Sequence, residues 1–367
     1  MRAERSRSLS SSRPHSKRLS VERLEDRSLM AGNVTAAVTG GVLVITGDAS
    51  DNGVTVDYIQ ANNSYQVIGT SQGGTNTTIN SLDTSVAGNE QIFANVTKGI
   101  KITLNAGNDN LVFGAAATST FVVTGGNVEI DAGIGNDTVA IGRNGNAAGG
   151  AAPIENEVNI SKSLVVKLGL GNDTLTMTNT TVSKNLVIHG DPVSGNGQAD
   201  GNDSVTFPTT FTPAGGVLTN FPVQVGGKTT VQLGGGVDTF NALNLTSRGG
   251  MLIDDRAGNL TFDMVDSTVG GELKMVKNGG TANDIEMRNV VTGTLRMQTG
   301  NGLDTIAIRD SIFARMYLDT AGARDQITIG NTRVTKLGLI NGGREKARLT
   351  QEPGNVLRGV AKVRTFV

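Results

Sequence analysis

The feature that most constrains the fold of this 367-residue chain is a pair of apolar residues, separated by one position, that returns every 21 or 22 residues. A fixed period of this length is typical of a solenoid, in which each repeat packs on its neighbours. The sequence therefore predicts one stacked array instead of several globular domains. The pairs are Leu164/Val166, Leu186/Ile188, Met251/Ile253, Leu273/Met275, Leu295/Met297, Met316/Leu318 and Leu337/Leu339.

The repeat at 295–316 shows how the chain is expected to turn. Apolar residues alternate at 295–297 and at 306–308, which predicts two strands with a glycine-containing turn between them, and Asp310 marks a corner before a third strand. Three strands in 21 to 22 residues predict an all-β fold, a parallel β-helix with an irregular N-terminal β cap. A β-sandwich is the less favoured alternative, because its strands run antiparallel and require no three-strand period.

The pattern divides the chain into four predicted parts. Within them, 57–92 is read as an excursion, a hairpin or a capping subdomain, and the proline-containing stretch 206–228 is expected to loop out. Such caps hide the open strand edges at the ends of a solenoid. The four parts are a basic, disordered export leader at 1–31, a first rung with the capping excursion at 32–98, the parallel β-helix at 99–340, and a basic cap or tail at 341–367.

Composition and charge limit the function classes. The 50 glycines stand at fixed positions between the apolar pairs, which favours a turn-rich fold over a disordered glycine-rich tract. The absence of cysteine excludes a disulfide scaffold and thiol catalysis. Of the 32 basic and 33 acidic residues, 1–27 and 341–367 hold 14 and 6, so the body carries 18 and 27, a net charge of −9. An acidic body argues against a nucleic-acid-binding protein.

The N-terminal segment carries a short motif, Val21-Glu22-x-Leu24-Glu25-Asp26-Arg27-x-Leu29. It resembles the N-terminal leader of planctomycete extracellular proteins, except that Met30 stands where that family usually has leucine. The resemblance covers about fourteen residues and implies an exported or cell-surface protein. The chain has neither the apolar core of a Sec signal peptide nor an apolar run long enough to span a membrane.

Turns of the type Gly-Asn-Asp are the candidate chemical sites. The turns at 132–139 and 168–175 resemble single cycles of the RTX calcium-binding nonapeptide. The resemblance implies calcium bound by backbone carbonyls and aspartates, although RTX cycles follow one another directly and these turns lie about 20 to 36 residues apart. The predicted calcium ligands are Asp109, Asp137, Asp173, Asp203, Asp238, Asp304 and Asp325.

Two interpretations of these turns stay open. Glycine permits positive φ, and Asp or Asn bonds the backbone two residues on, so turn chemistry alone explains the motif. Against this, stacked carboxylates such as Asp304 and Asp325 would repel one another, and a cation would relieve the repulsion. A second set of Asn and Asp residues lies at the corners, two positions after the second apolar pair: Asn179, Asp266, Asn289, Asp310 and Asn331. A stacked column of this kind is expected to bond backbone groups along the stack, so Asn179, Asn289 and Asn331 are read as structural.

These observations predict an exported, non-enzymatic β-solenoid that serves as a structural or adhesive element of the cell surface. Its expected partners are cell-envelope or extracellular-matrix components, without nucleic acid and without a transmembrane span. The alternative is a β-helix polysaccharide lyase or hydrolase, with Asp254-Asp255-Arg256 and His189 as the candidate acid–base residues. Aromatic residues, which stack on sugar rings, make up only 4 % of the chain.

Overall fold

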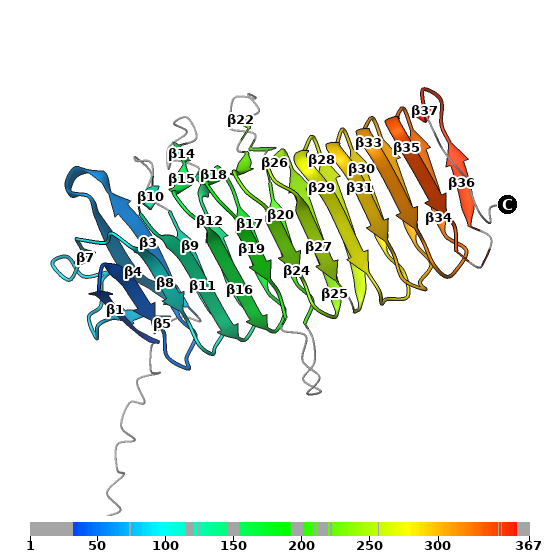
Figure 1. Ribbon diagram of the computed structural model, residues 1–367. Helices are drawn as coiled ribbons and strands as arrows, with labels where there is room; N and C mark the ends of the chain where they lie inside the picture. The colour runs from blue at the N-terminus through cyan, green and yellow to red at the C-terminus, as the bar shows by residue number, and fades with distance from the viewer. Residues whose placement is uncertain are drawn as a thin grey trace, which may run out of the picture. The chain divides into compact units, whose positions relative to one another are not determined.

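The computed structural model describes residues 32–357 with gaps at 73–74, 115–120, 124, 146–153, 192–200, 209, 212–218, 221, 256, 344 and 346. These residues form an all-β structure dominated by two large sheets of mostly parallel strands, neither of which closes on itself (Figure 1). Their only helical element is a single 3₁₀ turn, η1 (Gln60–Asn62). The described part contains no helix long and apolar enough to cross a membrane.

The larger sheet contains one long strand and, in the first half, one short strand from each repeat. From β29 onward the two merge into a single strand. The long strands are β2 (Val42–Thr46), β8 (Gly99–Thr103), β11 (Asn127–Ile134), β16 (Leu164–Leu170), β19 (Leu186–His189), β24 (Thr229–Gln232), β27 (Met251–Asp255), β29 (Thr268–Lys277), β31 (Val291–Gln298), β33 (Ile312–Asp319) and β35 (Arg333–Asn341). The short strands are β10 (Phe121–Val123), β15 (Val158–Ile160), β18 (Thr180–Val182), β23 (Val223–Val225) and β26 (Leu245–Ser247), and β37 (Val356–Leu357) ends the sheet.

The smaller sheet receives one strand from each repeat, and successive strands pair in parallel. Each of these strands follows a turn after a long strand of the larger sheet, so the chain passes alternately between the two sheets. They are β3 (Gly53–Ile59), β9 (Asn110–Phe113), β12 (Thr138–Ile141), β17 (Thr174–Met177), β20 (Ser204–Phe207), β25 (Val237–Leu243), β28 (Asn259–Val265), β30 (Asp284–Arg288), β32 (Thr305–Arg309), β34 (Gln326–Gly330) and β36 (Arg348–Gln351).

In the first half, the register agrees with the predicted period between β16 and β19, where Leu164 pairs with Leu186, and in the second half it agrees throughout. There, equivalent residues lie 21 to 23 positions apart. In the smaller sheet of the first half, the corresponding steps are 28, 36, 30 and 35 residues, so the predicted period of 21 to 22 is wrong for this part of the stack. The extra residues enter between strands, where two antiparallel hairpins lie, and leave the paired strands in register. The hairpins are β13 (Arg143–Gly145) with β14 (Ile154–Asn156) and β21 (Thr210–Phe211) with β22 (Thr219–Asn220).

One predicted apolar pair was also wrong. Met251, Leu273, Leu295 and Met316 pair in sequence as expected, but Met316 pairs with Gly338 and not with Leu337. A register shift earlier in the β33–β35 pair moves the pattern by one residue. Because side chains alternate between the two faces of a strand, Leu339 is 39 % exposed while Ile340 is buried.

The N-terminal end differs from the rest because antiparallel pairs are added to its parallel ones. β1 (Asn33–Thr39) pairs with β2, and β4 (Ser64–Gln72) pairs with both β3 and β7 (Gln91–Phe93). Two short strands, β5 (Thr75–Asn76) and β6 (Thr78–Ile79), complete this end. Antiparallel hairpins therefore occupy the segment 57–92 that was read as an excursion. The predicted leader at 1–31 and residues 358–367 of the predicted cap or tail at 341–367 lie outside the described residues, whereas β36 and β37 of that segment extend the two sheets.

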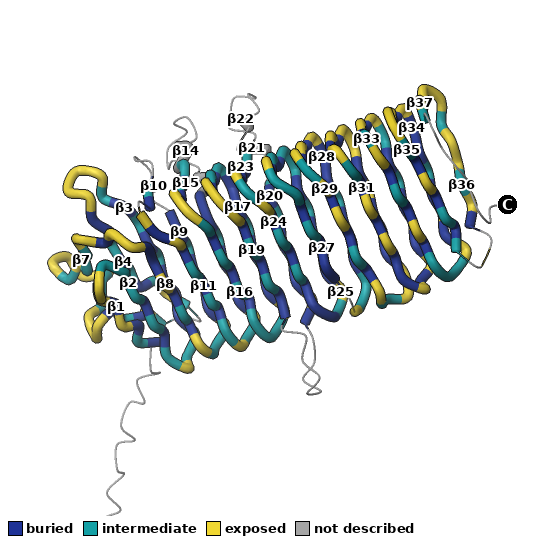
Figure 2. Tube along the Cα trace, in the orientation of Figure 1, coloured by how far each residue is buried: buried dark blue, intermediate teal, exposed yellow. Residues whose placement is uncertain are grey.

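The core lies between the sheets and is built from alternating apolar residues. Along each strand, buried residues alternate with more exposed ones (Figure 2). Equivalent core positions form columns, such as Phe207, Phe240 and Phe262, whose neighbouring rings lie 5.6 and 5.4 Å apart. The repeats are thus joined both by strand pairing and by apolar contact between like residues.

Glycines line the turns that lead into the smaller sheet, where the repeats approach closely. A Cβ atom on Gly171, which has a φ of +132°, would lie 1.9 Å from the carbonyl oxygen of Gly135. A Cβ on Gly135 would lie 1.8 Å from the carbonyl oxygen of Gly107. The close stacking of these backbones therefore requires glycine at both positions.

We expect Gly171→Ala to lower the free energy of unfolding by about 3 kcal/mol or more, because the methyl group meets the backbone of the preceding repeat. The matched control is Gly40→Ala, whose φ is also positive, +59°, but whose Cβ would meet nothing within 4 Å. This control should cost about 1 kcal/mol. Urea denaturation followed by circular dichroism measures both; equal losses would contradict the close-stacking argument.

Candidate functional site

The seven predicted calcium ligands form one column inside the turns that lead into the smaller sheet. Each stands at or directly before the start of a strand of that sheet, and the strand register places them in consecutive repeats apart from one interruption. Every one of these carboxylates is at most 1 % exposed. The structure therefore brings Asp109, Asp137, Asp173, Asp203, Asp238, Asp304 and Asp325 together as a buried column, one residue per repeat.

Each aspartate of the column is bound to the repeat before it. The backbone N–H of Asp109 donates to Oδ1 of Asp137 at 2.8 Å, and the N–H of Asp137 donates to Oδ1 of Asp173 at 2.7 Å. The same bond continues through Asp203 and Asp238, at 3.1 and 2.8 Å, and joins Asp304 to Asp325 at 2.9 Å. Hydrogen bonds from backbone N–H groups are the interaction that stabilises a buried carboxylate.

In four of these turns, an asparagine precedes the aspartate and bonds in the opposite direction. Oδ1 of Asn108 accepts the backbone N–H of Asn136 at 2.8 Å, and Oδ1 of Asn136 accepts that of Asn172 at 2.8 Å. Oδ1 of Asn172 and Oδ1 of Asn202 continue this row at the surface. In these turns, the exposed amide oxygen of the asparagine accepts a bond from the following repeat, and the buried carboxylate of the aspartate accepts one from the preceding repeat. Each such turn is therefore bonded to both of its neighbours.

The column is electrostatically costly. The pKa values of these aspartates are raised, mainly because the carboxylates are buried, and in most cases neighbouring carboxylates raise them further. Hydrogen bonds from backbone N–H groups partly offset the rise. Burial raises the pKa of Asp137 to about 6, of Asp109, Asp173 and Asp238 to about 7, and of Asp203 to about 8. It also raises the pKa of Asp304 and Asp325.

The column is interrupted where Leu260 pairs with Asp238. Beyond Leu260 it resumes with Asn283, whose Oδ1 accepts the backbone N–H of Leu260 at 2.9 Å. The Nδ2 of Asn283 donates to Oδ1 of Asp304 at 2.7 Å. An amide therefore occupies a column position and keeps the hydrogen bonds on both sides without a charge.

A buried lysine that the sequence reasoning did not single out lies at this interruption. Nζ of Lys277 contacts Oδ1 of Asp255 at 3.2 Å, and both side chains are fully buried. The same ammonium group donates to the carbonyl oxygens of Ala257 at 3.0 Å and Gly258 at 2.6 Å. Three acceptors around one ammonium compensate for its removal from water. Asp255, one of the candidate acid–base residues, is therefore paired inside the structure.

The carboxylate oxygens that lack hydrogen-bond partners decide whether the column can bind a metal ion. Oδ2 has no hydrogen-bond partner in six of the seven aspartates, Asp203 being the exception, and each Oδ1 is already an acceptor. Calcium requires six to eight oxygens. Among the described residues, no three His, Cys, Asp or Glu side chains lie close enough together to hold a metal ion. This donor set does not make a complete calcium site, and calcium binding stays a prediction.

The corner residues at the other end of the smaller-sheet strands take the backbone conformation of a turn. Asn179, Asp266, Asn289, Asp310 and Asn331 all have positive φ, between 41° and 54°. Their side chains bond to one another across repeats: Asn289 donates to Asp266, and Asn331 donates to Asp310, each at 2.7 Å. The sequence reasoning expected these side chains to bond the backbone instead.

That backbone role belongs to the serine that follows some corners, which the sequence reasoning missed. Oγ of Ser267 accepts the N–H of Leu245 at 3.0 Å, and Oγ of Ser311 accepts the N–H of Val290 at 3.0 Å. A serine directly after an Asp corner is the signal that could have predicted these bonds.

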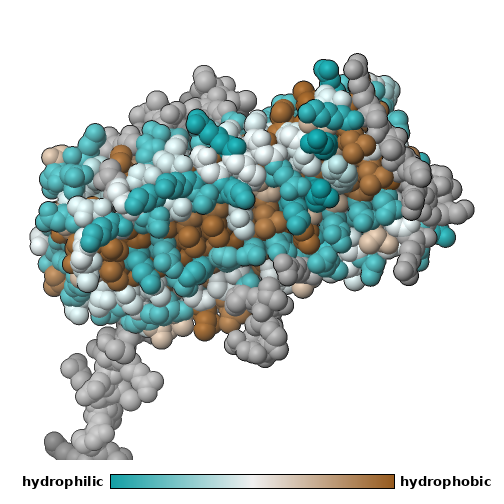
Figure 3. Space-filling view, viewed as in Figure 1, coloured by the Kyte–Doolittle hydropathy of each residue, from teal (hydrophilic) through white to brown (hydrophobic). Residues whose placement is uncertain are grey.

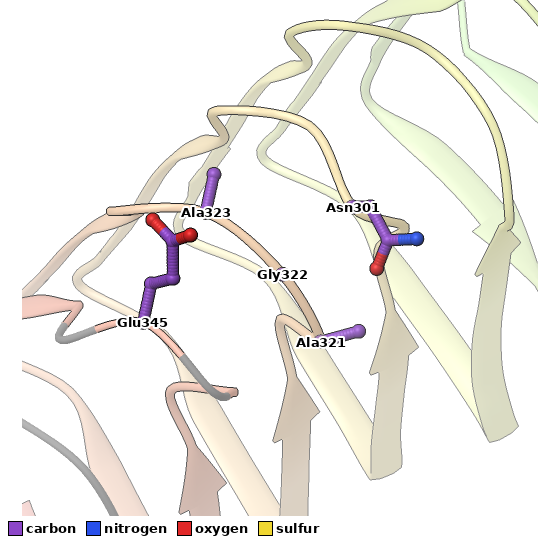
Figure 4. A pocket seen from close by; sticks show the side chains of 5 residues that line it. All are labelled: Asn301, Ala321, Gly322, Ala323 and Glu345. Atoms are coloured by element: carbon purple, nitrogen blue, oxygen red, sulfur yellow. The ribbon is translucent and has the colours of Figure 1, made fainter.

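Two further features could bear on a ligand. His189 ends β19, and its pKa is lowered by burial and by the nearby charge of Lys167. A hollow at the turn edge of the last repeats is lined by Asn301, Ala321, Gly322, Ala323 and Glu345 (Figure 4). Only Asn301 and Glu345 contribute polar side chains to this hollow, and His189 lies in a different part of the stack.

Comparison with known proteins adds no family to this description. No protein-family model matches the chain, and no curated protein or solved structure matches it.

The raised pKa values predict how stability depends on pH. A group whose pKa is higher in the folded state than in the unfolded state stabilises the fold when protonated, and this contribution is lost as pH rises from about 4 through the folded value. For Asp173 that window ends near pH 7. We expect the melting temperature, followed by circular dichroism, to be several degrees higher at pH 5 than at pH 8.

Asp173→Asn tests the origin of this dependence, because Asn283 shows that an amide fits the column. The variant should lose less stability than the wild type between pH 5 and pH 8. Asp284→Asn, at an exposed position on β30, removes the same charge outside the column and should leave the wild-type profile unchanged. An Asp173→Asn profile parallel to that of the wild type would contradict this account.

Proposed function

We propose that the two sheets are walls of one parallel β-helix and that the protein is an exported, non-enzymatic component of the cell surface with a structural or adhesive role. The parallel register across ten or more repeats and the alternation of the chain between the sheets support the β-helix. Export is supported by the leader-like motif at 21–29. The motif resembles that of planctomycete extracellular proteins.

The observation that supports the structural role is that the polar side chains of the turns bond neighbouring repeats. The aspartates singled out as chemical ligands bond the backbone of the preceding repeat, and the asparagines that precede four of them bond the following one. These groups therefore serve stacking. A scaffold or adhesive element requires such stacking along its length, whereas an enzyme requires polar groups that face a substrate.

The second candidate function is a β-helix polysaccharide lyase or hydrolase. It requires an acid–base residue within reach of a polymer, and Asp255 is buried against Lys277. That position therefore does not support the alternative. Reproducible turnover of pectin, alginate or a sulfated polysaccharide by the purified protein would establish it in place of the structural role.

Surface display tests the proposal directly. An antibody raised against residues 32–367 should label intact, unpermeabilised cells of the source organism that carry the full-length chain. A chain lacking residues 19–31 should accumulate inside the cells, because it lacks the leader-like motif. Retention of both chains inside the cells would contradict export, and display of both would contradict the role given to the motif.

A further inference from the structure

A row of basic side chains follows one edge of the repeats. Each member lies in the turn that leads into a long strand of the larger sheet, before β8, β16, β19, β24 or β27, and each is exposed. We call this row the basic ridge; it consists of Lys98, Lys162, Lys184, Lys228 and Arg248.

Backbone bonds join the neighbouring turns that carry the ridge. The N–H of Lys184 donates to the carbonyl oxygen of Lys162 at 3.1 Å, and the N–H of Gly227 donates to that of Lys184 at 2.7 Å. The turn before β11 has Gly126 against the carbonyl of Lys98 and carries no basic residue. Five charges thus follow six consecutive repeats, a length of about 24 Å at the spacing of paired strands.

The charges of the ridge are not neutralised within the protein. Among the described residues, none of the five forms an ion pair, although Glu129 on the neighbouring strand face pairs with Lys167 at 2.8 Å. In the next two repeats, the corresponding edge carries Gly270, Gly271 and Gly293, which interrupt the row before exposed basic residues return on this edge at Arg315 and Lys336. The body of the chain has a net charge of −9, which makes a row of unpaired positive charge unusual on it.

The geometry points to a linear anion as the partner. Like charges spaced by one repeat repel one another, and a polymer with regularly spaced negative charges would relieve this repulsion along the whole row. Hydrophilic side chains form bands along the direction of stacking (Figure 3), so an extended chain can follow them. Serine, asparagine and glycine separate the basic residues in these turns, and no aromatic residue is present on which a nucleic-acid base could stack.

We propose that the basic ridge binds a linear acidic polysaccharide, with carboxylate or sulfate groups along it facing the five basic side chains. The inference rests on the proposed function, since it names the partner class of a surface component. Each exposed charge pair contributes little alone, so affinity arises from several contacts to one polymer and falls as salt is added.

The test uses the full-length chain and immobilised polysaccharides. We expect binding to polygalacturonate, which carries carboxylates, or to dextran sulfate, and the two probes distinguish the anionic group. Binding should weaken at high ionic strength and be absent on uncharged dextran. A single-stranded DNA oligonucleotide serves as the competing polyanion; preference for DNA over both polysaccharides would overturn the proposal.

Matched variants locate the site. The triple variant K162Q/K184Q/K228Q should bind the polysaccharide roughly tenfold more weakly, because three adjacent contacts are lost. The control K274Q/R288Q/R333Q removes the same charge from exposed positions outside the ridge and should bind as the wild type does. Equal losses in both variants, or no loss in the first, would overturn the proposal. Surface labelling of the triple variant should be unchanged, which separates failure of the ridge from failure of export.

Discussion

The interaction on which the rest of the structure depends is the hydrogen bonding of the buried aspartates in the turns, which in four turns is joined by the asparagine before the aspartate. Oδ1 of Asp173 holds the N–H of Asp137 in the repeat before, and Oδ1 of Asn172 holds the N–H of Asn202 in the repeat after. Backbone groups in a turn cannot all be paired by the sheets, and unpaired buried groups are destabilising. The two bonds satisfy these groups and also fix the register of the strand that follows.

This arrangement places carboxylates inside the structure, where a negative charge is unfavourable. A carboxylate that bonds a neighbouring repeat must lie inside, so the column accumulates buried acids with raised pKa values. Where Leu260 interrupts the column, the ion pair of Lys277 with Asp255 lies beside it. Burial raises the pKa of Asp238 and of Asp304, and the positive charge of Lys277 offsets a small part of that rise. The exposed basic ridge lies along a different edge, so the two sets of charges serve different purposes: stacking inside and recognition outside.

Much of this could be predicted from the sequence where a local pattern repeats. The apolar pairs from Met251 to Met316 predicted the strand register because burial selects every second residue. Prediction failed at Leu337, where a register shift leaves no signature in the apolar pattern, and in the smaller sheet of the first half, where residues inserted between strands lengthen the repeats. The Gly-Asn-Asp motif indicated the site, but the direction of its bonds and the pairing of Lys277 with Asp255 depend on contacts between distant residues.

The most direct test of the central claim is thermal unfolding of the full-length protein, stripped of metal, with EGTA and with millimolar calcium. If the turns are closed by their own backbone bonds, the two melting curves followed by circular dichroism coincide. A large upward shift with calcium, or folding only in its presence, would show that the buried aspartates are ion ligands and that their bonds to the neighbouring repeats are secondary.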